Sequence, residues 1–258
     1  MRLTGRAPNP LRVLVVGDSM VLGRVTAGVT QTIPYVLRAV EELRLGATRR
    51  GQCAGLPEIR WVGTETGSDS TSFHLSNWCG SNAVSGRAAT HFVNGTSGAP
   101  TIAAIFAAIA ETRPNRVVLE VGYNDVGALD RTVAQAVADL TTLASQILAI
   151  DSSIIIHPTY VAPSLVSGYS KVADLQAYVA ANGIPGCIGT PWDMRGLTAA
   201  MIVDPTDGHP SIPANPTTAA GWTALDPATK GVVYLGGQLF KALYGNRAVP
   251  GLSGEVWS

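Results

Sequence analysis

The sequence predicts a three-layer α/β/α sandwich on a mostly parallel sheet of about five strands. Short apolar runs rich in β-branched residues alternate with segments of helical periodicity, and such alternation indicates βαβ crossovers and hence parallel strands. A chain of 258 residues is long enough for one large, well-buried core. No internal repeat or interdomain linker is evident, so we expect a single domain over residues 1–258, with a core of about 12–244 and short terminal extensions.

The predicted strands follow from composition. Three runs have the residues expected of strands that are buried on both faces. They are RVLVV at 12–16, RVVLEV at 116–121 and SIIIH at 153–157. Two further runs are weaker candidates for strands, namely IRWVG at 59–63 and GCIGT at 186–190.

The predicted helices lie between these runs. Thr32 can cap the first helix, and Pro34 stands in its first turn. Apolar residues at helical spacing mark three helices: Val36, Leu37, Val40 and Leu43 in the first, Ile102, Ile105, Phe106 and Ile109 in the second, and Leu129, Val133, Val137, Leu140, Ala144 and Leu148 in the third. Two more helices are predicted over 172–181 and 230–244, although Gly236 and Gly237 lower the helix propensity of the last.

Two segments do not fit the alternation. Residues 64–98 and 203–229 are long, polar and dotted with aromatic residues and histidines, so both are predicted to be loops. Loops of this length inside a compact domain are usually functional.

Charge and composition exclude several functions. Charged residues make up 14% of the chain, and 18 basic residues balance 18 acidic ones without a basic run, which argues against nucleic acid and anionic membranes as partners. No apolar run approaches the about 18 to 20 residues of a membrane helix. The first residues, MRLTGRAPNP, lack the apolar stretch of a signal peptide, so the chain is expected to be cytosolic or to begin at a mature end.

No metal or organic cofactor is expected. The three cysteines, Cys53, Cys79 and Cys187, lack metal-type spacing. A bridge between Cys53 and Cys79 is left open by the sequence. The chain contains neither a G-x-x-x-x-G-K-[ST] loop nor a G-x-G-x-x-G fingerprint, so nucleotide binding has no support.

The motif GDSM places Ser19 directly after the first predicted strand, at the sheet edge where open α/β folds bind ligands. Ser19 either caps the next segment or attacks substrates. A serine nucleophile needs a base to take its proton and donors for the oxyanion that forms. The interpretation therefore depends on partners elsewhere in the chain.

Three further motifs could supply those partners. His209 in DPTDGHPS stands on a tight turn beside Asp207 and is either a general base or a solvated surface histidine. Asn124 in EVGYNDVG ends a strand and either donates to an oxyanion or forms an Asx turn. Gly86 in SGRAATH offers a backbone N–H that can approach a substrate closely, a weak signal by itself.

Taken in order from about residue 12 to 244, GDS, the glycine, GYND and DGHP resemble the SGNH (GDSL-type) hydrolases. The resemblance implies a flavodoxin-like fold with Ser19 as nucleophile and His209 as base, oriented by an aspartate. It also implies an oxyanion hole made by the N–H groups of Ser19 and Gly86 and the side chain of Asn124, with Gly80 as an alternative to Gly86.

The acid of the triad departs from the family pattern. The family usually has an aspartate three residues before the histidine, and Thr206 occupies that position here. Asp207 is the expected orienting acid because it is nearest to His209, and Asp204 or a backbone carbonyl are the alternatives.

The implied reaction is hydrolysis of short-chain acyl esters on carbohydrate. The chain looks like the acetyl xylan esterases of carbohydrate esterase family three in IRWVGTETG and GRAAT, and polar loops with scattered aromatic residues suit sugars. Asp18, Trp78 and Trp192 are the candidate substrate contacts. Lipid-like acyl esters are the alternative substrates. A non-catalytic carbohydrate-binding protein is disfavoured because serine, asparagine and histidine are all present.

Overall fold

The computed structural model describes residues 9–18, 20, 36–37, 39–41, 43–44, 56–63, 65–67, 78–83, 86–164, 169–202 and 231–245. For 65–67 and 78–83 it describes the backbone alone. Everything below concerns these residues.

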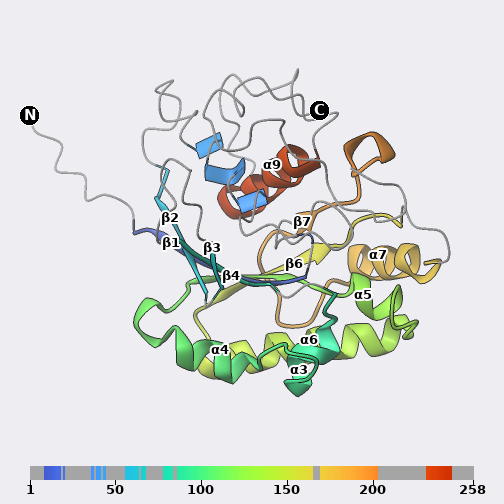
Figure 1. Cartoon of the computed structure of the whole chain (residues 1–258), viewed down its shortest axis with the longest axis horizontal. Coiled ribbons are helices and arrows are strands. Elements are labelled where there is room, and N and C mark those ends of the chain that lie inside the picture. The colour runs from blue at the N-terminus through green and yellow to red at the C-terminus, as the bar shows by residue number, and fades with distance from the viewer. Residues whose placement is uncertain are drawn as a thin grey trace, which may run out of the picture.

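The sheet is centred on β1 (Leu11–Gly17) and is mostly parallel, as predicted (Figure 1). On one side, β1 pairs with β2 (Ile59–Val62) along its first half and with β4 (Trp78–Ala83) at its end. On the other side follow β5 (Arg116–Glu120), β6 (Ile155–Tyr160) and the two-residue β7 (Trp192–Asp193), all parallel. Only β3 (Glu65–Gly67), which pairs with β4, is antiparallel within the described sheet.

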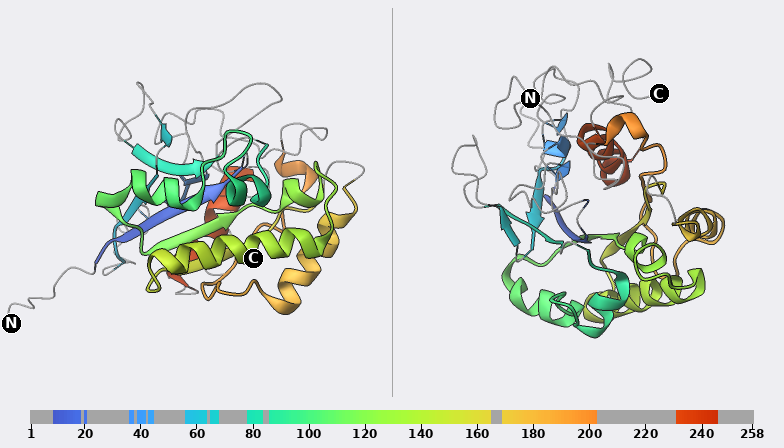
Figure 2. Two further views of the ribbon diagram at one scale, coloured as in Figure 1. Left: turned by 90° about the horizontal axis from the view of Figure 1, so that it is seen from below. Right: turned by 45° about the vertical axis from the view of Figure 1, so that its right-hand side comes forward.

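Helices cover both faces of the sheet (Figure 2). One face carries α3 (Ala89–Asn94), α4 (Ile102–Ala108), α6 (Val133–Ile150) and α7 (Lys171–Asn182). The opposite face carries α9 (Gly231–Tyr244) and the helical residues 36–37, 39–41 and 43–44. The short α5 (Tyr123–Val126) follows β5, and single 3₁₀ turns occur at η1 (Ala110–Thr112) and η2 (Ala199–Met201).

The alternation of side chains in β1 explains the two cores. Val13 and Val15 pack into the cluster under α9, whereas Leu14 and Val16 pack into the cluster under α6. All four side chains are fully buried. Successive residues of a strand point to opposite faces, so a strand with helices on both sides must be apolar throughout.

Helix α6 begins at a capping box. Thr132 Oγ1 accepts the Gln135 N–H at 3.2 Å, and Gln135 Oε1 accepts the Thr132 N–H at 2.9 Å. Among the described residues, α6 is the one helix that is long and apolar enough, by length and composition, to cross a membrane. In this fold its apolar stripe, which includes Leu140, Leu143 and Ile147, is buried against the sheet.

The structure corrects two of the sequence predictions. The segment 64–98 is not one loop, because it contains β3, β4 and α3. The run at 186–190 is not a strand: Gly186 has a φ of +85° in a turn and Ile188 is 79% exposed. A strand forms two residues later, at β7, where Trp192 is fully buried.

The two helical segments of the α9 face touch through their backbones at Gly236. A Cβ built on Gly236 would lie 2.4 Å from the Ala39 Cβ and 3.0 Å from the Val36 carbonyl oxygen. Carbon atoms pack at about 3.5 to 4.0 Å. Glycine at this position therefore allows the close approach, at the expense of helix propensity.

We expect Gly236→Ala to lower the free energy of unfolding by about 1 to 3 kcal/mol, because overpacking outweighs the higher helix propensity of alanine. Urea unfolding of the variant measures this loss. The double variant Gly236→Ala/Ala39→Gly removes the closest overlap, so it should recover part of the loss and be less destabilised than the sum of the single variants. A stability equal to or above that of the unsubstituted chain in Gly236→Ala would contradict the packing argument.

Candidate active site

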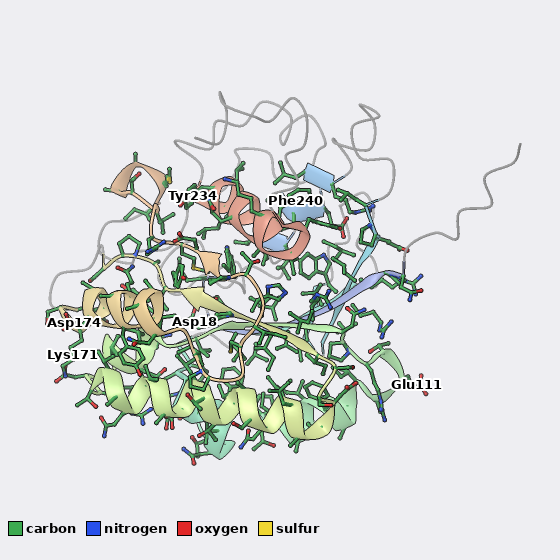
Figure 3. All side chains as sticks on the ribbon, turned by 180° about the vertical axis from the view of Figure 1, so that it is seen from behind. Asp18, Glu111, Lys171, Asp174, Tyr234 and Phe240 are labelled. Atoms are coloured by element: carbon green, nitrogen blue, oxygen red, sulfur yellow. The ribbon has the colours of Figure 1, made fainter. Side chains whose placement is uncertain are left out.

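Three neighbouring strands end level with one another, and this positions the candidate site. In the parallel register Gly17 of β1 pairs with Ala83 of β4 on one side and with Glu120 of β5 on the other. The loops that follow these strands therefore start side by side at the carboxyl edge of the sheet. Figure 3 shows Asp18 at this edge, on the side of Lys171 and Asp174 of α7, with Glu111 at the opposite end of the molecule.

Asp18 holds the turn after β1. Its side chain is 1% exposed, and its Oδ1 accepts the Met20 N–H at 3.0 Å, as in an Asx turn. Its own N–H donates to Glu120 Oε2 at 3.0 Å. Both residues that flank position 19 in the sequence are therefore fixed, although Ser19 itself lies outside the described residues.

Asn124 joins the loop after β5 to the other two loops. Its Nδ2 donates to Asp18 Oδ2 at 2.8 Å and to the Arg87 carbonyl oxygen at 3.0 Å. Gly122 makes this turn possible with a φ of +119°, and a Cβ at Gly122 would meet Leu175 Cδ2 at 3.3 Å. The GDS, glycine and GYND motifs of the sequence thus meet at one point.

Asp125 anchors the glycine segment. This fully buried carboxylate accepts the N–H groups of Ala89 at 2.6 Å and Thr90 at 3.3 Å, at the start of α3. Arg131 Nη1 lies 2.8 Å from the same carboxylate and balances its charge. The N-terminal turn of α3, two residues after Arg87, is therefore tied to α5.

Gly86 has the better geometry of the two candidate glycines. It is exposed, has a φ of +70° and directly precedes Arg87, whose carbonyl accepts from Asn124. Gly80 lies inside β4, three residues before the strand ends. Gly86 therefore lies in the loop after β4, next to the residue that Asn124 contacts, whereas Gly80 lies within the strand.

Burial controls the electrostatics of the site. Asp18 and Glu120 are both almost fully buried and adjacent, and burial raises the pKa of each above its ordinary value. Burial also raises the pKa of Asp125, an effect opposed by its backbone N–H donors and by Arg131. The pKa of Tyr123 rises to about 12, chiefly because its hydroxyl is buried.

The structure contradicts two of the predicted substrate contacts, Trp192 and Asp18. Trp192 is fully buried in β7, and its Nε1 donates to the Leu235 carbonyl at 3.0 Å, so no ring face is open to a sugar. Asp18 is buried, and its two carboxylate oxygens accept from Met20 and Asn124, so it is a structural partner of the site. Trp78 begins strand β4 and does not lie in a loop as expected.

Several predicted residues lie outside the described residues: Ser19, Asp204, Asp207, His209, Cys53 and the side chain of Cys79. Cys187 is a free thiol. Within the described ranges, no cluster of three or more His, Cys, Asp or Glu could hold a metal ion.

Glu120 was not predicted from the sequence as a site residue. Its signal is present in the run RVVLEV, where an acidic residue stands between Leu119 and Val121 at the end of a mostly apolar strand. A carboxyl group in such a position is buried unless the strand is at an edge.

Comparisons with known proteins establish the fold. No protein-family model matches the chain, and no curated protein matches it by sequence. Three solved structures share its fold with TM-scores of 0.58, 0.59 and 0.56, each at 17% sequence identity. They are a mutant acetyl esterase with an acetate ion, a carbohydrate esterase family 3 protein from Talaromyces cellulolyticus and a family 3 carbohydrate esterase from Clostridium thermocellum.

The likeness extends over nearly the whole of each chain. The acetyl esterase match covers 94% of this chain and 100% of that one, the Talaromyces match 91% and 96%, and the Clostridium match 95% and 100%. The expected flavodoxin-like α/β fold is thus confirmed. At 17% sequence identity the similarity shows that the strands and helices are arranged alike. Function has to be argued from the site.

The buried carboxyl pair predicts a pH-dependent stability. Because the folded chain raises the pKa of Glu120 above its ordinary value of 4.5, the folded state holds its proton more tightly than the unfolded state does. The free energy of unfolding should therefore fall as pH rises from the ordinary value through the folded pKa. In Glu120→Gln this group no longer titrates, so unfolding in urea at a series of pH values should show a shallower decline. Equal slopes for the two proteins would contradict the prediction.

Proposed function

We propose that this chain is a serine esterase that removes short acyl groups, in the first place acetyl, from carbohydrate esters. The observation that carries the proposal is the meeting of Asp18, Asn124 and the Gly86–Arg87 turn at the carboxyl edge of the sheet. Open α/β sheets bind ligands at this edge. Ser19 follows Asp18 directly in the sequence, so its hydroxyl is the nucleophile that this arrangement would serve.

The proposed reaction is acyl transfer in two steps. His209 takes the proton of the Ser19 hydroxyl, and the serine oxygen attacks the ester carbonyl carbon. The bond between the carbonyl carbon and the sugar oxygen then breaks, and the sugar oxygen takes the proton from His209 and leaves as a hydroxyl. A water molecule, whose proton the same histidine takes, then attacks the acyl-serine, and the serine oxygen leaves with that proton as the carboxylic acid is released. These steps use side chains and water alone.

The oxyanion of the intermediate would be held by the N–H groups of Ser19 and Gly86 and by the side chain of Asn124. The two hydrogens of Asn124 Nδ2 are directed to Asp18 and to the Arg87 carbonyl in the described structure. The proposed contact therefore uses the Nδ2 hydrogen that points to the Arg87 carbonyl, which would turn its hydrogen bond wholly or partly to the oxyanion. Such fixed donors are typically worth about 10² to 10³ in kcat each.

Two observations favour an acyl group on a carbohydrate. The segment 64–98 is rich in serine, threonine, glycine and asparagine, which suits hydrogen bonding to sugar hydroxyls. The fold is shared with proteins described as an acetyl esterase and as family 3 carbohydrate esterases.

Ser19→Ala should abolish hydrolysis of p-nitrophenyl acetate and of acetylated xylan, because it removes the hydroxyl that would form the acyl-enzyme. The melting temperature should stay close to that of the unsubstituted chain, since the change removes one oxygen atom. Release of nitrophenolate and of acetate measures activity. Activity retained in the folded variant would overturn the proposal, and a preference for octanoyl over acetyl esters would redirect it to lipid-like substrates.

The identity of the orienting acid is tested by comparing Asp207→Ala with Asp204→Ala. We expect Asp207→Ala to lower kcat by about 10² or more, as loss of the imidazole partner does in other triads. Asp204→Ala serves as the matched control and should stay within a few-fold of the unsubstituted chain. The reverse ranking would assign the role to Asp204, and two nearly unchanged variants would indicate a backbone carbonyl.

A further inference from the structure

Glu120 is an acid in an apolar position. It ends β5 on the same face as Val118, two residues earlier, and that face is covered by the apolar cluster that includes Met20 and Trp192. Glu120 is 2% exposed. An apolar side chain would fill this position without the desolvation of a carboxyl group, so a contact specific to glutamate has to account for it.

That contact is Asp18. Glu120 Oε2 accepts the Asp18 N–H at 3.0 Å, which extends the β1–β5 ladder by one bond beyond the Gly17–Glu120 pair. The two carboxyl groups also lie close enough for the charge of Asp18 to raise the pKa of Glu120. The side chain of Glu120 therefore holds the backbone of Asp18 and lies beside its carboxyl group.

We propose that Glu120 is a positioning residue for the oxyanion hole, which acts by holding the Asp18 carboxylate against the side-chain amide of Asn124. The inference rests on the proposed esterase function and names a residue that the mechanism does not otherwise use. Within the part of the chain that the structure describes, Glu120 reaches Asn124 through Asp18, in the order Glu120, Asp18, Asn124 and the substrate oxygen.

We assign one proton to the pair and place it on Glu120, on the basis of the hydrogen bonds that Asp18 accepts. Asp18 already accepts from the Met20 N–H and from Asn124 Nδ2, and two such donors favour its ionised form. Glu120 Oε2 accepts the Asp18 N–H, and two adjacent buried carboxyl groups do not readily ionise together, so the proton is assigned to Glu120. Among the described residues, the charge of Asp125 also raises the pKa of Asp18, and the charge of Asp18 raises the pKa of Tyr123.

This arrangement determines which way the Asn124 amide points. A carboxylate only accepts hydrogen bonds, so Asp18 selects the orientation in which Nδ2 faces it and Oδ1 does not. The second Nδ2 hydrogen is then directed to the Arg87 carbonyl, beside Gly86. If Glu120 lost its proton, two adjacent carboxylates would oppose the negative charge that develops on the substrate oxygen.

The experiment compares two variants with a matched control. Glu120→Gln keeps an acceptor for the Asp18 N–H and a permanent donor for its carboxylate, whereas Glu120→Leu removes both. Val117→Ala, a fully buried residue on the same strand that packs into the opposite core, loses two methyl groups and serves as the control for reduced stability. Each is assayed for kcat and KM with p-nitrophenyl acetate across pH, beside Ser19→Ala, with urea unfolding in parallel.

We expect Glu120→Leu to lose about tenfold or more in kcat with KM nearly unchanged, as expected when a transition-state contact is weakened. Val117→Ala should keep its kcat even where it is the less stable protein. Glu120→Gln should restore kcat to near the level of the unsubstituted chain. It should also remain active toward higher pH, because the proton that Glu120 loses there is replaced by a fixed amide hydrogen.

The outcomes separate the two proposals. Hydrolysis that is absent in the unsubstituted chain or unaffected by Ser19→Ala overturns the esterase function. Hydrolysis that depends on Ser19 but stays within twofold in folded Glu120→Leu overturns the role of Glu120. If Glu120→Leu does not fold, Glu120→Gln decides: a low kcat, or an alkaline limb identical to that of the unsubstituted chain, rejects the positioning role.

Discussion

The level ends of β4, β1 and β5 are the constraint on which the candidate site depends. Gly17 is paired with Ala83 and with Glu120, so the three loops that follow leave the sheet at the same height. A slip of one residue would move a loop by about 3.3 Å along the strand. The hydrogen bond from Asn124 to Asp18, at 2.8 Å, does not survive such a shift. The register is held by β1, whose four central side chains are fully buried on both faces.

Two adjacent residues of the GYND motif then perform different tasks. Asn124 links the loop after β5 to Asp18 and to Arg87, and so connects all three strand ends. Asp125 points to α3 and accepts its first two free N–H groups, with Arg131 as its counter-charge. The side chain that faces the proposed reaction centre is thus held on a turn that its neighbour has already fixed.

The periodicity of apolar residues predicted the strands and helices that follow from local composition. It failed for segments whose structure depends on contacts with residues distant in the sequence. The strands β1, β5 and β6 and the helices α4, α6, α7 and α9 were all indicated by apolar patterns. Strand β4 reads WCGSNA and has no β-branched residue, so its extended backbone comes from pairing with β1. The burial of Trp192 likewise depends on α9, which is distant in sequence and accepts its indole N–H.

The motifs predicted which residues lie at the site better than they predicted the hydrogen bonds between those residues. They placed Asp18, Gly86 and Asn124 after predicted strands or in long loops, and in the structure each follows a strand that ends at the same edge of the sheet. They did not reveal that Asp18 is turned inward, since a residue between a strand and a proposed nucleophile can face either way. That direction is set by Glu120 and by the Met20 N–H, which together offer Asp18 partners that water would otherwise supply.

The Asp18–Glu120 carboxyl pair is better explained by the geometry of the proposed site than by the packing of the fold. Replacing buried polar pairs by apolar residues of similar volume is often neutral or stabilising. Glu120 shares its face of β5 with Val118, which packs into an apolar cluster, so the apolar surroundings alone give no reason for a glutamate there. The reason has to lie in the direction that Glu120 imposes on Asp18, and through Asp18 on the one side-chain amide that three strand ends bring to the same point.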